Sequence, residues 1–380
     1  MSDILTKNST ASRFTALDVF RGLTVCFMII VNSSGNGDTT FWALKHAVWN
    51  GFTPTDLVFP SFIFAIGSAL SFSMKRWEVM KQSEVLWKIL KRTLLIFIIG
   101  YLMYWFPFFK LDAHSNLIIL PISETRIMGV LQRIALCYGI VALMVYYLGT
   151  KKTIFFGVLF LIAYWVLLLI FGASGAEFTK TGNAVLRLDT WVFGSNHLYK
   201  SGGFPFDPEG ILSTLPALFN VIGGYVVGYF LQQKGKNYEV LAKLLMSGFL
   251  LLFIAYCWDP YFPVNKKLWT SSYALMTVGL DCIILSIIVY FTDILGKTRG
   301  TNFFLVLGKN PLIIYLISEL GLTIMHLTHI GNKSVVNWLY YNFFIYSGEY
   351  FGAFLFSVFW MLVCWSIGYI LDKMKIYIKI

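Results

Sequence analysis

Residues 153–172 read TIFFGVLFLIAYWVLLLIFG, twenty consecutive residues without a charged side chain. A helix of this length crosses the roughly 30 Å hydrocarbon core of a bilayer, because each helical residue adds about 1.5 Å. Similar runs recur along the chain, and charged residues make up only 13% of it, against about 25% in a soluble domain. The sequence therefore predicts an integral membrane protein.

The apolar runs predict an all-α, polytopic transmembrane helical bundle with about ten membrane-spanning helices, folded as a single domain over 1–380. The loops on one predicted side are tight apart from the basic link at 75–88, those on the other side are long, and no internal repeat is evident. The predicted spans are 17–33, 54–74, 88–108, 127–148, 153–172, 210–231, 239–257, 268–292, 302–328 and 350–372.

Lysine and arginine set the expected orientation. Seventeen of them fall at the two ends of the chain or near the loops after even-numbered spans, and nine fall in the loops after odd-numbered spans. Cytoplasmic loops carry the positive excess in membrane proteins, so both termini are predicted to be cytoplasmic. The same bias explains the net charge of +11, which indicates a lipid bilayer rather than nucleic acid as the partner. The long outer loops are 34–53, 109–126, 173–209, 258–267 and 329–349.

The densest polar cluster runs from Asn32 through the first outer loop to the start of the second span. Within it, Thr53 suits a helix N-cap, Pro54 the first helical position and Asp56 the third. Asp56 is therefore expected either to cap this helix or to orient His46. An imidazole titrates near neutrality and can accept a proton from an attacking group, which makes His46 the candidate catalytic residue. A lone histidine in a structural role is the alternative.

Ionisable residues inside spans should face the bundle interior, because a charge at the bilayer centre costs about 2.5–3.5 kcal/mol. Arg133 and Glu319 lie at similar predicted depths, which favours a structural ion pair between them, and Asp281 lies near the middle of its span.

Arg21 and Lys309 lie near the predicted inner face. Lys309 precedes Asn310-Pro311, where the proline should break the helix and free backbone groups. Cations at such a break can bind phosphate, although snorkelling to the interface explains them about as well.

No metal site is predicted. The five histidines (His46, His114, His197, His326 and His329) all fall in the outer half without a metal-ligand spacing. The five cysteines fall in or beside apolar runs and are expected to pack as small core residues.

Seven stretches resemble the heparan-alpha-glucosaminide N-acetyltransferase family. They are spread from residue 17 to 311, so that the resemblance extends over nearly the whole chain, and together they are quite specific. They are Leu17-Asp-Val-Phe-Arg-Gly-Leu-Thr24, His46-Ala-Val-Trp-Asn-Gly51, Thr55-Asp-Leu-Val-Phe-Pro60, Arg126-Ile-Met-Gly-Val-Leu-Gln-Arg-Ile134, Phe206-Asp-Pro-Glu-Gly-Ile-Leu-Ser-Thr-Leu-Pro216, Asn265-Lys-Lys-Leu-Trp-Thr-Ser-Ser-Tyr273 and Gly308-Lys-Asn-Pro311.

The resemblance implies a transmembrane acetyltransferase that takes acetyl-CoA on the cytosolic side and acetylates a terminal glucosamine amine on the far side. It implies that His46 is catalytic and that Asn32 lies near the reaction centre. The chain length suggests a bacterial member in the inner (plasma) membrane, without the extra lumenal part of the animal enzyme. An amino sugar or another periplasmic glycan is then the expected acceptor.

The candidate residues for binding the acetyl donor, acetyl-CoA, are Arg21, Lys309 and Arg133. Arg21 and Lys309 are chosen from their charge and position in the sequence, and the resemblance does not add to this. His46, with Asp56, is expected either to deprotonate the acceptor or to carry the acetyl group itself. A sugar permease for N-acetylglucosamine or its oligomers is the alternative function, since aromatic outer loops and intramembrane charges would serve it too. The sequence leaves the oligomeric state open, with a homodimer among the alternatives.

Overall fold

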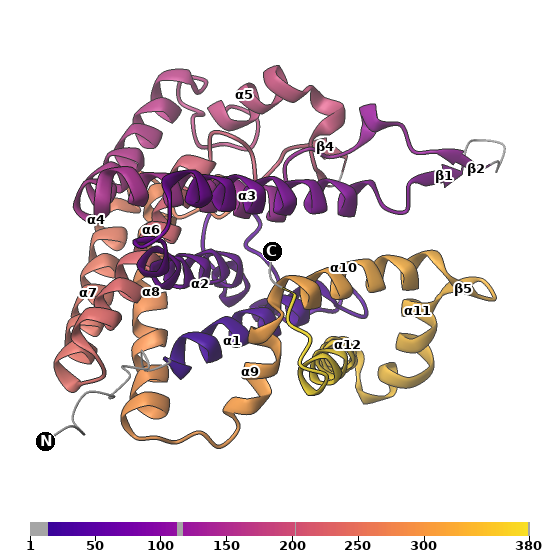
Figure 1. Ribbon diagram of the computed structural model, residues 1–380. Coiled ribbons are helices and arrows are strands. Elements are labelled where there is room, and N and C mark those ends of the chain that lie inside the picture. The colour runs from indigo at the N-terminus through magenta and orange to yellow at the C-terminus, as the bar shows by residue number, and fades with distance from the viewer. Residues whose placement is uncertain (1–13, 112–116, 202, 379–380) are drawn as a thin grey trace, which may run out of the picture.

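The computed structural model describes residues 14–111, 117–201 and 203–378, and Figure 1 shows them as a bundle of α-helices. The helices are α1 Thr15–Asn32, α2 Pro54–Trp77, α3 Gln82–Trp105, α4 Val130–Phe171, α5 Ala184–Phe193, α6 Thr214–Lys234, α7 Tyr238–Trp258, α8 Ser271–Val289, α9 Thr301–Lys309, α10 Pro311–Leu327, α11 Val335–Leu339 and α12 Glu349–Lys373.

Three small antiparallel hairpins and several short helical turns fill the connections. The hairpins pair β1 Phe109–Leu111 with β2 Leu117–Ile119, β3 Lys200–Ser201 with β4 Phe204–Pro205, and β5 His329–Ile330 with β6 Lys333–Ser334. The 3₁₀ turns are Trp42–Leu44, Ile122–Glu124, Ser195–His197 and Ile345–Ser347, and the π-helical turns are Tyr290–Ile294 and Tyr340–Phe344.

Seven helices of the described residues are long and apolar enough to cross a membrane, or eight if the bent pair α9–α10 forms one span. The chain is therefore a multi-pass membrane protein, as predicted, but the count of ten is not confirmed. Two of the predicted spans are merged in α4, where Gly149, at a φ of 71°, breaks the helix. Helix α3 is not among the candidate spans because Lys88, Lys91 and Arg92 lie within its apolar stretch.

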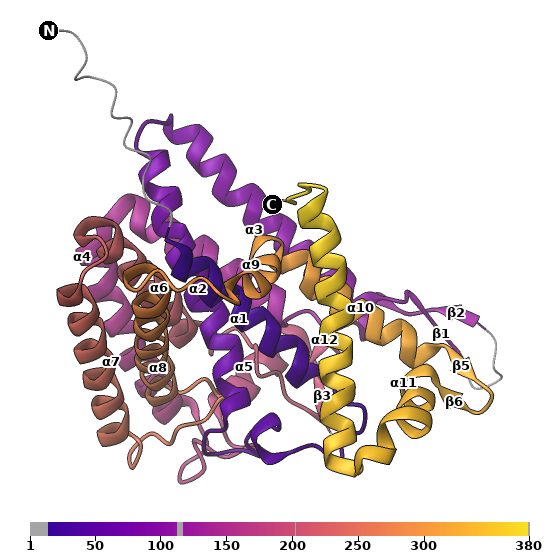
Figure 2. The ribbon, with the colours of Figure 1, turned by 90° about the horizontal axis from the view of Figure 1, so that it is seen from below.

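The candidate spans differ in the share of their residues that is buried. In an apolar stretch of 18 residues from each, this share is 61% in α1, 67% in α2, 67% in α6 and 56% in the span that begins with α8, but only 22% in α4 and in α7. The four well-covered helices therefore form the core, and α4 and α7 present apolar faces outward. Helices α9 to α12 lie together beside α1 in both views (Figures 1 and 2).

The expected helix break at Pro311 is confirmed. Helices α9 and α10 meet there at 83°. Asn310 lies at the junction, where its side chain donates to the carbonyl oxygen of Ile376 and accepts from the backbone N–H of Ile378. A segment beyond α12 therefore supplies backbone partners at the break.

The start of α1 and the end of α12 lie toward the same side of the bundle in Figure 2. The end of α1 and the start of α2 point the other way, and the connection between them carries His46. Buried charges behave as expected within the core, since Arg133 and Asp281 have no exposed surface. Among the cysteines, Cys257 is exposed, so it is not the core residue that was expected; the other four are buried.

Helices α2 and α6 approach each other through glycines. A Cβ atom on Gly67 would lie 2.0 Å from the backbone oxygen of Val221, and one on Gly224 would lie 1.9 Å from that of Phe64. Small residues allow helix backbones to pack this closely in membrane proteins. The pair is important for the site because α2 carries Asp56 at its first turn.

We expect Gly67→Ala to lower the stability of the bundle, because the new methyl group meets backbone atoms that can move only with the helix. The cost should be about 1–3 kcal/mol in the free energy of unfolding. Thermal unfolding of the purified protein in detergent measures it. Gly37→Ala, in the outer loop where a Cβ atom meets nothing within 4 Å, is the control. Equal unfolding temperatures for the two variants would contradict the expectation.

Candidate active site

The first turn of α2 is built around the carboxylate of Asp56, which is fully buried. Its Oδ2 atom accepts from the backbone N–H of Thr53 at 3.0 Å and from that of Ala47 at 3.2 Å, and the Thr53 hydroxyl lies 3.0 Å away. The N-cap at Thr53 and the helix start at Pro54 are as predicted. With these donors around it, Asp56 is an anion that caps the helix.

The same carboxylate also orients His46. Oδ1 of Asp56 lies 2.7 Å from Nδ1 of His46. Since Asp56 is ionised, Nδ1 must carry the proton that it donates, which leaves the lone pair of the neutral ring on Nε2. The two expectations for Asp56, helix capping and orientation of His46, are therefore both met by one side chain.

His46 is accessible: 43% of its side-chain surface is exposed. The burial of the remainder lowers the pKa of His46 below its usual 6.5, the hydrogen bond to Asp56 opposes this, and the charge of Lys266 adds to the lowering. The imidazole is therefore neutral at pH 7 and able to accept a proton.

Lys266 lies directly against the imidazole. Its Nζ atom is 3.0 Å from Nε2 and 3.1 Å from Nδ1 of His46. Because the two distances are nearly equal, the ammonium group lies over the face of the ring, beside Nε2 and not along its lone pair. Burial lowers the pKa of Lys266, while the carboxylates of Glu209 and Asp56 act in the opposite direction.

Lys266 reaches His46 because two outer loops are joined. The backbone N–H of Gly51 donates to the carbonyl oxygen of Val264 at 2.8 Å, and Nδ2 of Asn265 donates to the side chain of Asn50 at 3.0 Å. On the far side of Asn265 the chain turns through Trp269, which is fully buried at a φ of 52°. Packing around Trp269 holds the backbone of this bulky residue in the left-handed region of φ/ψ space. The loop that contains Lys266 is therefore anchored to the core at Trp269.

A second charged cluster lies next to His46. Arg126 donates to both carboxylate oxygens of Asp207, at 2.9 and 2.7 Å, and to Glu209 at 2.6 Å. Its guanidinium group lies between two aromatic rings, 4.7 Å from the centroid of Tyr104 and 4.8 Å from that of Tyr199.

The two carboxylates of this cluster titrate in opposite directions. Burial raises the pKa of Asp207. For Glu209, burial acts in the same direction but is outweighed by Arg126, Arg133 and Lys266, so its pKa is lowered and it stays ionised. Glu209 also lies close enough to act on the charge of His46. The site therefore contains an extended array of alternating charges.

The expected ion pair between Arg133 and Glu319 is wrong. Arg133 donates to the carbonyl oxygen of Gly210 at 2.9 Å and to the hydroxyl of Ser213, and it lies against the ring of Trp269. Equal depth in the membrane is not enough for two side chains to pair, and these two contact different neighbours. Arg133 is also fully buried, which does not favour its expected contact with acetyl-CoA.

Glu319 instead joins Asn32, whose Nδ2 atom donates to it at 3.0 Å. Asn32 is at the end of α1, where the resemblance placed a residue of the reaction centre. Among the described residues, no hydrogen bond connects Asn32 with His46 or Asp56. Asn32 and Glu319 thus form a polar pair between the last residue of α1 and the middle of α10.

The two inner cations each contact a carboxylate. Arg21 donates to Asp18 at 2.7 Å, one turn away on α1, and Lys309 lies 2.7 Å from both oxygens of Asp372 on α12. About a quarter of each cationic side chain is exposed, 25% for Arg21 and 27% for Lys309. A phosphate could reach them by competing with these carboxylates.

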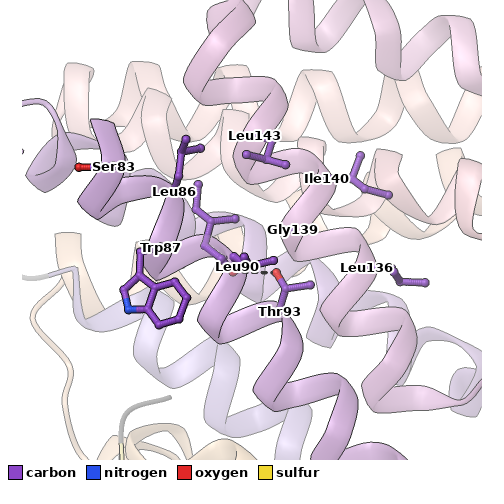
Figure 3. Close-up of a pocket in the computed structure, with 10 residues that line it drawn as sticks. Ser83, Leu86, Trp87, Leu90, Thr93, Leu136, Gly139, Ile140 and Leu143 are labelled. Atoms are coloured by element: carbon purple, nitrogen blue, oxygen red, sulfur yellow. Dashed lines mark hydrogen bonds between the residues drawn. The ribbon is translucent and has the colours of Figure 1, made fainter. Parts of the chain in front are cut away.

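A groove of about 620 Å³ lies away from His46, between α3 and α4 (Figure 3). Its lining is apolar apart from Ser83 and Thr93 and contains no acid or base, so it offers no groups for proton transfer. Within the described residues, no three His, Cys, Asp or Glu side chains are grouped to hold a metal ion. His114 lies outside the described residues.

Sequence reasoning missed Lys266, Arg126, Asp207 and Glu209 as site residues, although all four stand in the family-like stretches. One signal was available. Lys266 and Lys267 form a basic pair in a predicted outer loop, where the positive-inside rule makes such pairs uncommon. A cation that departs from this bias is a candidate for a specific contact.

The fold and the site define a multi-pass membrane protein with an aspartate-oriented histidine in the loop between α1 and α2. The family model "Heparan-alpha-glucosaminide N-acetyltransferase, catalytic" matches residues 13–254, more than half of the chain. The chain therefore belongs to the heparan-alpha-glucosaminide N-acetyltransferase family, as the sequence motifs indicated.

Two curated relatives carry the name heparan-alpha-glucosaminide N-acetyltransferase. The protein of Mus musculus is 27% identical over 371 residues, covering 83% of this chain and 54% of the relative. That of Homo sapiens is 27% identical over 364 residues, covering 81% of this chain and 53% of the relative. The chain thus spans about half the length of the curated relatives it matches.

We expect Asp56→Asn to destabilise the protein by about 1–3 kcal/mol, because the amide nitrogen of asparagine would face donors that now share a carboxylate. Urea or thermal unfolding in detergent measures the loss. Asp38→Asn, an exposed acid in the same loop, should unfold like the parent protein. If both variants lose the same stability, the capping role of Asp56 is refuted.

The lowered pKa of His46 predicts its reactivity toward diethyl pyrocarbonate, which modifies only the neutral ring. The rate should stay high as the pH falls through 6.5 and should drop only below it, since protonation occurs at the lowered pKa. Mass spectrometry of the peptide containing His46 gives this rate, with His46→Ala as the blank. A midpoint above 6.5 would contradict the arrangement.

Proposed function

We propose that this protein is a transmembrane acetyltransferase that moves an acetyl group from cytosolic acetyl-CoA to an amino sugar or glycan on the periplasmic side of a bacterial plasma membrane, with both termini in the cytoplasm. The observation that carries the proposal is the 2.7 Å contact between Asp56 and His46, which puts the proton on Nδ1 and so makes Nε2 of an accessible imidazole the base or nucleophile, with Lys266 beside it. Family membership supports the acyl transfer.

The donor is proposed to bind across the bundle. Acetyl-CoA carries phosphates that cannot cross lipid, so its nucleotide remains on the inner side with Arg21 and Lys309, whose side chains are partly exposed. The narrow pantetheine arm then has to cover about half of a 30 Å core to bring the thioester to His46. No metal is required for this chemistry.

The acceptor enters from the outer side, where the loop with His46 is accessible. In direct transfer, His46 removes a proton from the acceptor ammonium group, and the resulting amine attacks the thioester carbon and displaces CoA. In the two-step route, Nε2 attacks the thioester carbon first, CoA leaves, and the amine then takes the acetyl group from the acetyl-histidine. Asp56 serves both routes, since it fixes the tautomer and stabilises the imidazolium.

The proposal predicts that His46→Ala abolishes acetylation of glucosamine by the purified protein, with a loss of at least about 100-fold, because general base catalysis contributes 10²–10⁴-fold. Release of CoA from acetyl-CoA, followed with a thiol reagent, measures it. His326→Ala, at the outer end of α10, is the matched control and should retain activity.

The same variant separates the enzyme from the sugar permease. Proteoliposomes containing His46→Ala should take up labelled N-acetylglucosamine no differently from empty ones, as should the parent protein. The permease would be established instead by two results together: the parent protein takes up the sugar and His46→Ala does not, and the parent protein transfers no acetyl group to any amino sugar.

A further inference from the structure

Lys266 is placed where it can act on the acyl group. Its Nζ atom lies 3.0 Å from Nε2 of His46, the atom to which the proposed function assigns the chemistry. It comes from the connection between α7 and α8, far in sequence from the loop that carries His46, and the joined loops described above hold it there. A thioester carbonyl that approaches Nε2 therefore comes within reach of the lysine ammonium group.

Burial lowers the pKa of Lys266 on balance, and two carboxylates oppose this lowering. The carboxylates of Glu209 and Asp56 both act to keep it charged, against burial and the nearby cation of Lys267. The charged groups that act on His46 are Lys266 itself, Asp56 and Glu209. An ammonium group held beside Nε2 opposes protonation of the ring, so it keeps the imidazole in its reactive form.

We propose that Lys266 is a catalytic residue of the acyl transfer, which stabilises the negative charge that develops on the thioester carbonyl oxygen and holds His46 neutral before the reaction. The inference rests on the proposed function. It applies to both routes, because each one passes through a tetrahedral intermediate with an oxyanion.

In direct transfer the proposed step balances as follows. The acceptor ammonium gives one proton to Nε2 of His46, and the resulting amine nitrogen forms a bond to the thioester carbon. The carbonyl π electrons move to oxygen, and Lys266 leaves Nε2 to donate to this oxyanion. The C–S bond then breaks with its electrons on sulfur, which takes the proton from His46, while the second amine proton passes to solvent. The products are an amide, CoA and one proton.

The neighbouring Lys267 provides a control of the same charge in the same loop. Its Nζ atom donates to the carbonyl oxygen of Val48 at 2.7 Å, and no hydrogen bond within the described part of the chain links it to His46. A general loss of positive charge or a disturbed loop should affect both lysines, whereas the proposed role belongs to Lys266 alone.

The experiment compares Lys266→Met, Lys266→Arg and Lys267→Met in the purified full chain with acetyl-CoA and glucosamine. We expect Lys266→Met to lower kcat by about 100-fold or more, the effect of removing one donor to an oxyanion. Lys266→Arg should recover part of the loss because it retains the charge. Lys267→Met should match the parent protein.

A second readout does not depend on activity. The midpoint pH for modification of His46 by diethyl pyrocarbonate should rise in Lys266→Met and stay unchanged in Lys267→Met. Equal kinetic losses in the two methionine variants, or an unchanged midpoint in Lys266→Met, would overturn the inference. If the parent protein transfers no acetyl group to glucosamine or to other amino sugars, the proposed function fails, even where the midpoint still shifts.

Discussion

The buried carboxylate of Asp56 is the constraint on which the arrangement of the site around His46 depends. It accepts hydrogen bonds from two backbone N–H groups, at Thr53 and Ala47, and from the ring of His46. The backbone oxygen of the same residue accepts from the hydroxyl of Tyr273 on α8 at 2.6 Å. One residue therefore fixes the start of α2, the loop before it and the neighbouring helix together. A mobile loop would present the imidazole in many orientations, whereas this one presents a defined nitrogen.

The fixed orientation of His46 depends on the most buried helices of the bundle. Helices α2, α6 and α8 are more than half buried, and close glycine contacts fix α2 against α6. Trp269, at the start of α8, is packed between Phe59 and Arg133. The loops that carry His46 and Lys266 thus lead into the rigid helices α2 and α8, while the more exposed α4 and α7 face outward. A rigid base is what group transfer needs, because small displacements of a reacting atom reduce rates strongly.

Local patterns predicted their structures well. The Thr53-Pro54 start of α2 and the break at Pro311 each depend on residues adjacent in sequence, and both are confirmed. The spans followed from composition, although their number did not. Contacts between distant segments were harder to predict. The pairing of Arg133 with Glu319 was inferred from depth alone, but depth does not determine which face of a helix a side chain occupies. For the same reason the contact of Lys266 with His46, some 220 residues away, could not be predicted, although the basic pair Lys266-Lys267 marked the loop as unusual.

The junction between α9 and α10 has a consequence for the residues beyond α12. The amide of Asn310 imitates a peptide group, and it pairs with the carbonyl oxygen of Ile376 and the N–H of Ile378 much as an adjacent β-strand would. Such pairing recognises main-chain atoms and ignores the side chains. Substitutions at these two isoleucines should be tolerated as far as this contact is concerned, except for proline at 378, which has no N–H to donate. The bend between α9 and α10 is thus held by main-chain atoms of Ile376 and Ile378, and this contact places no constraint on their side chains.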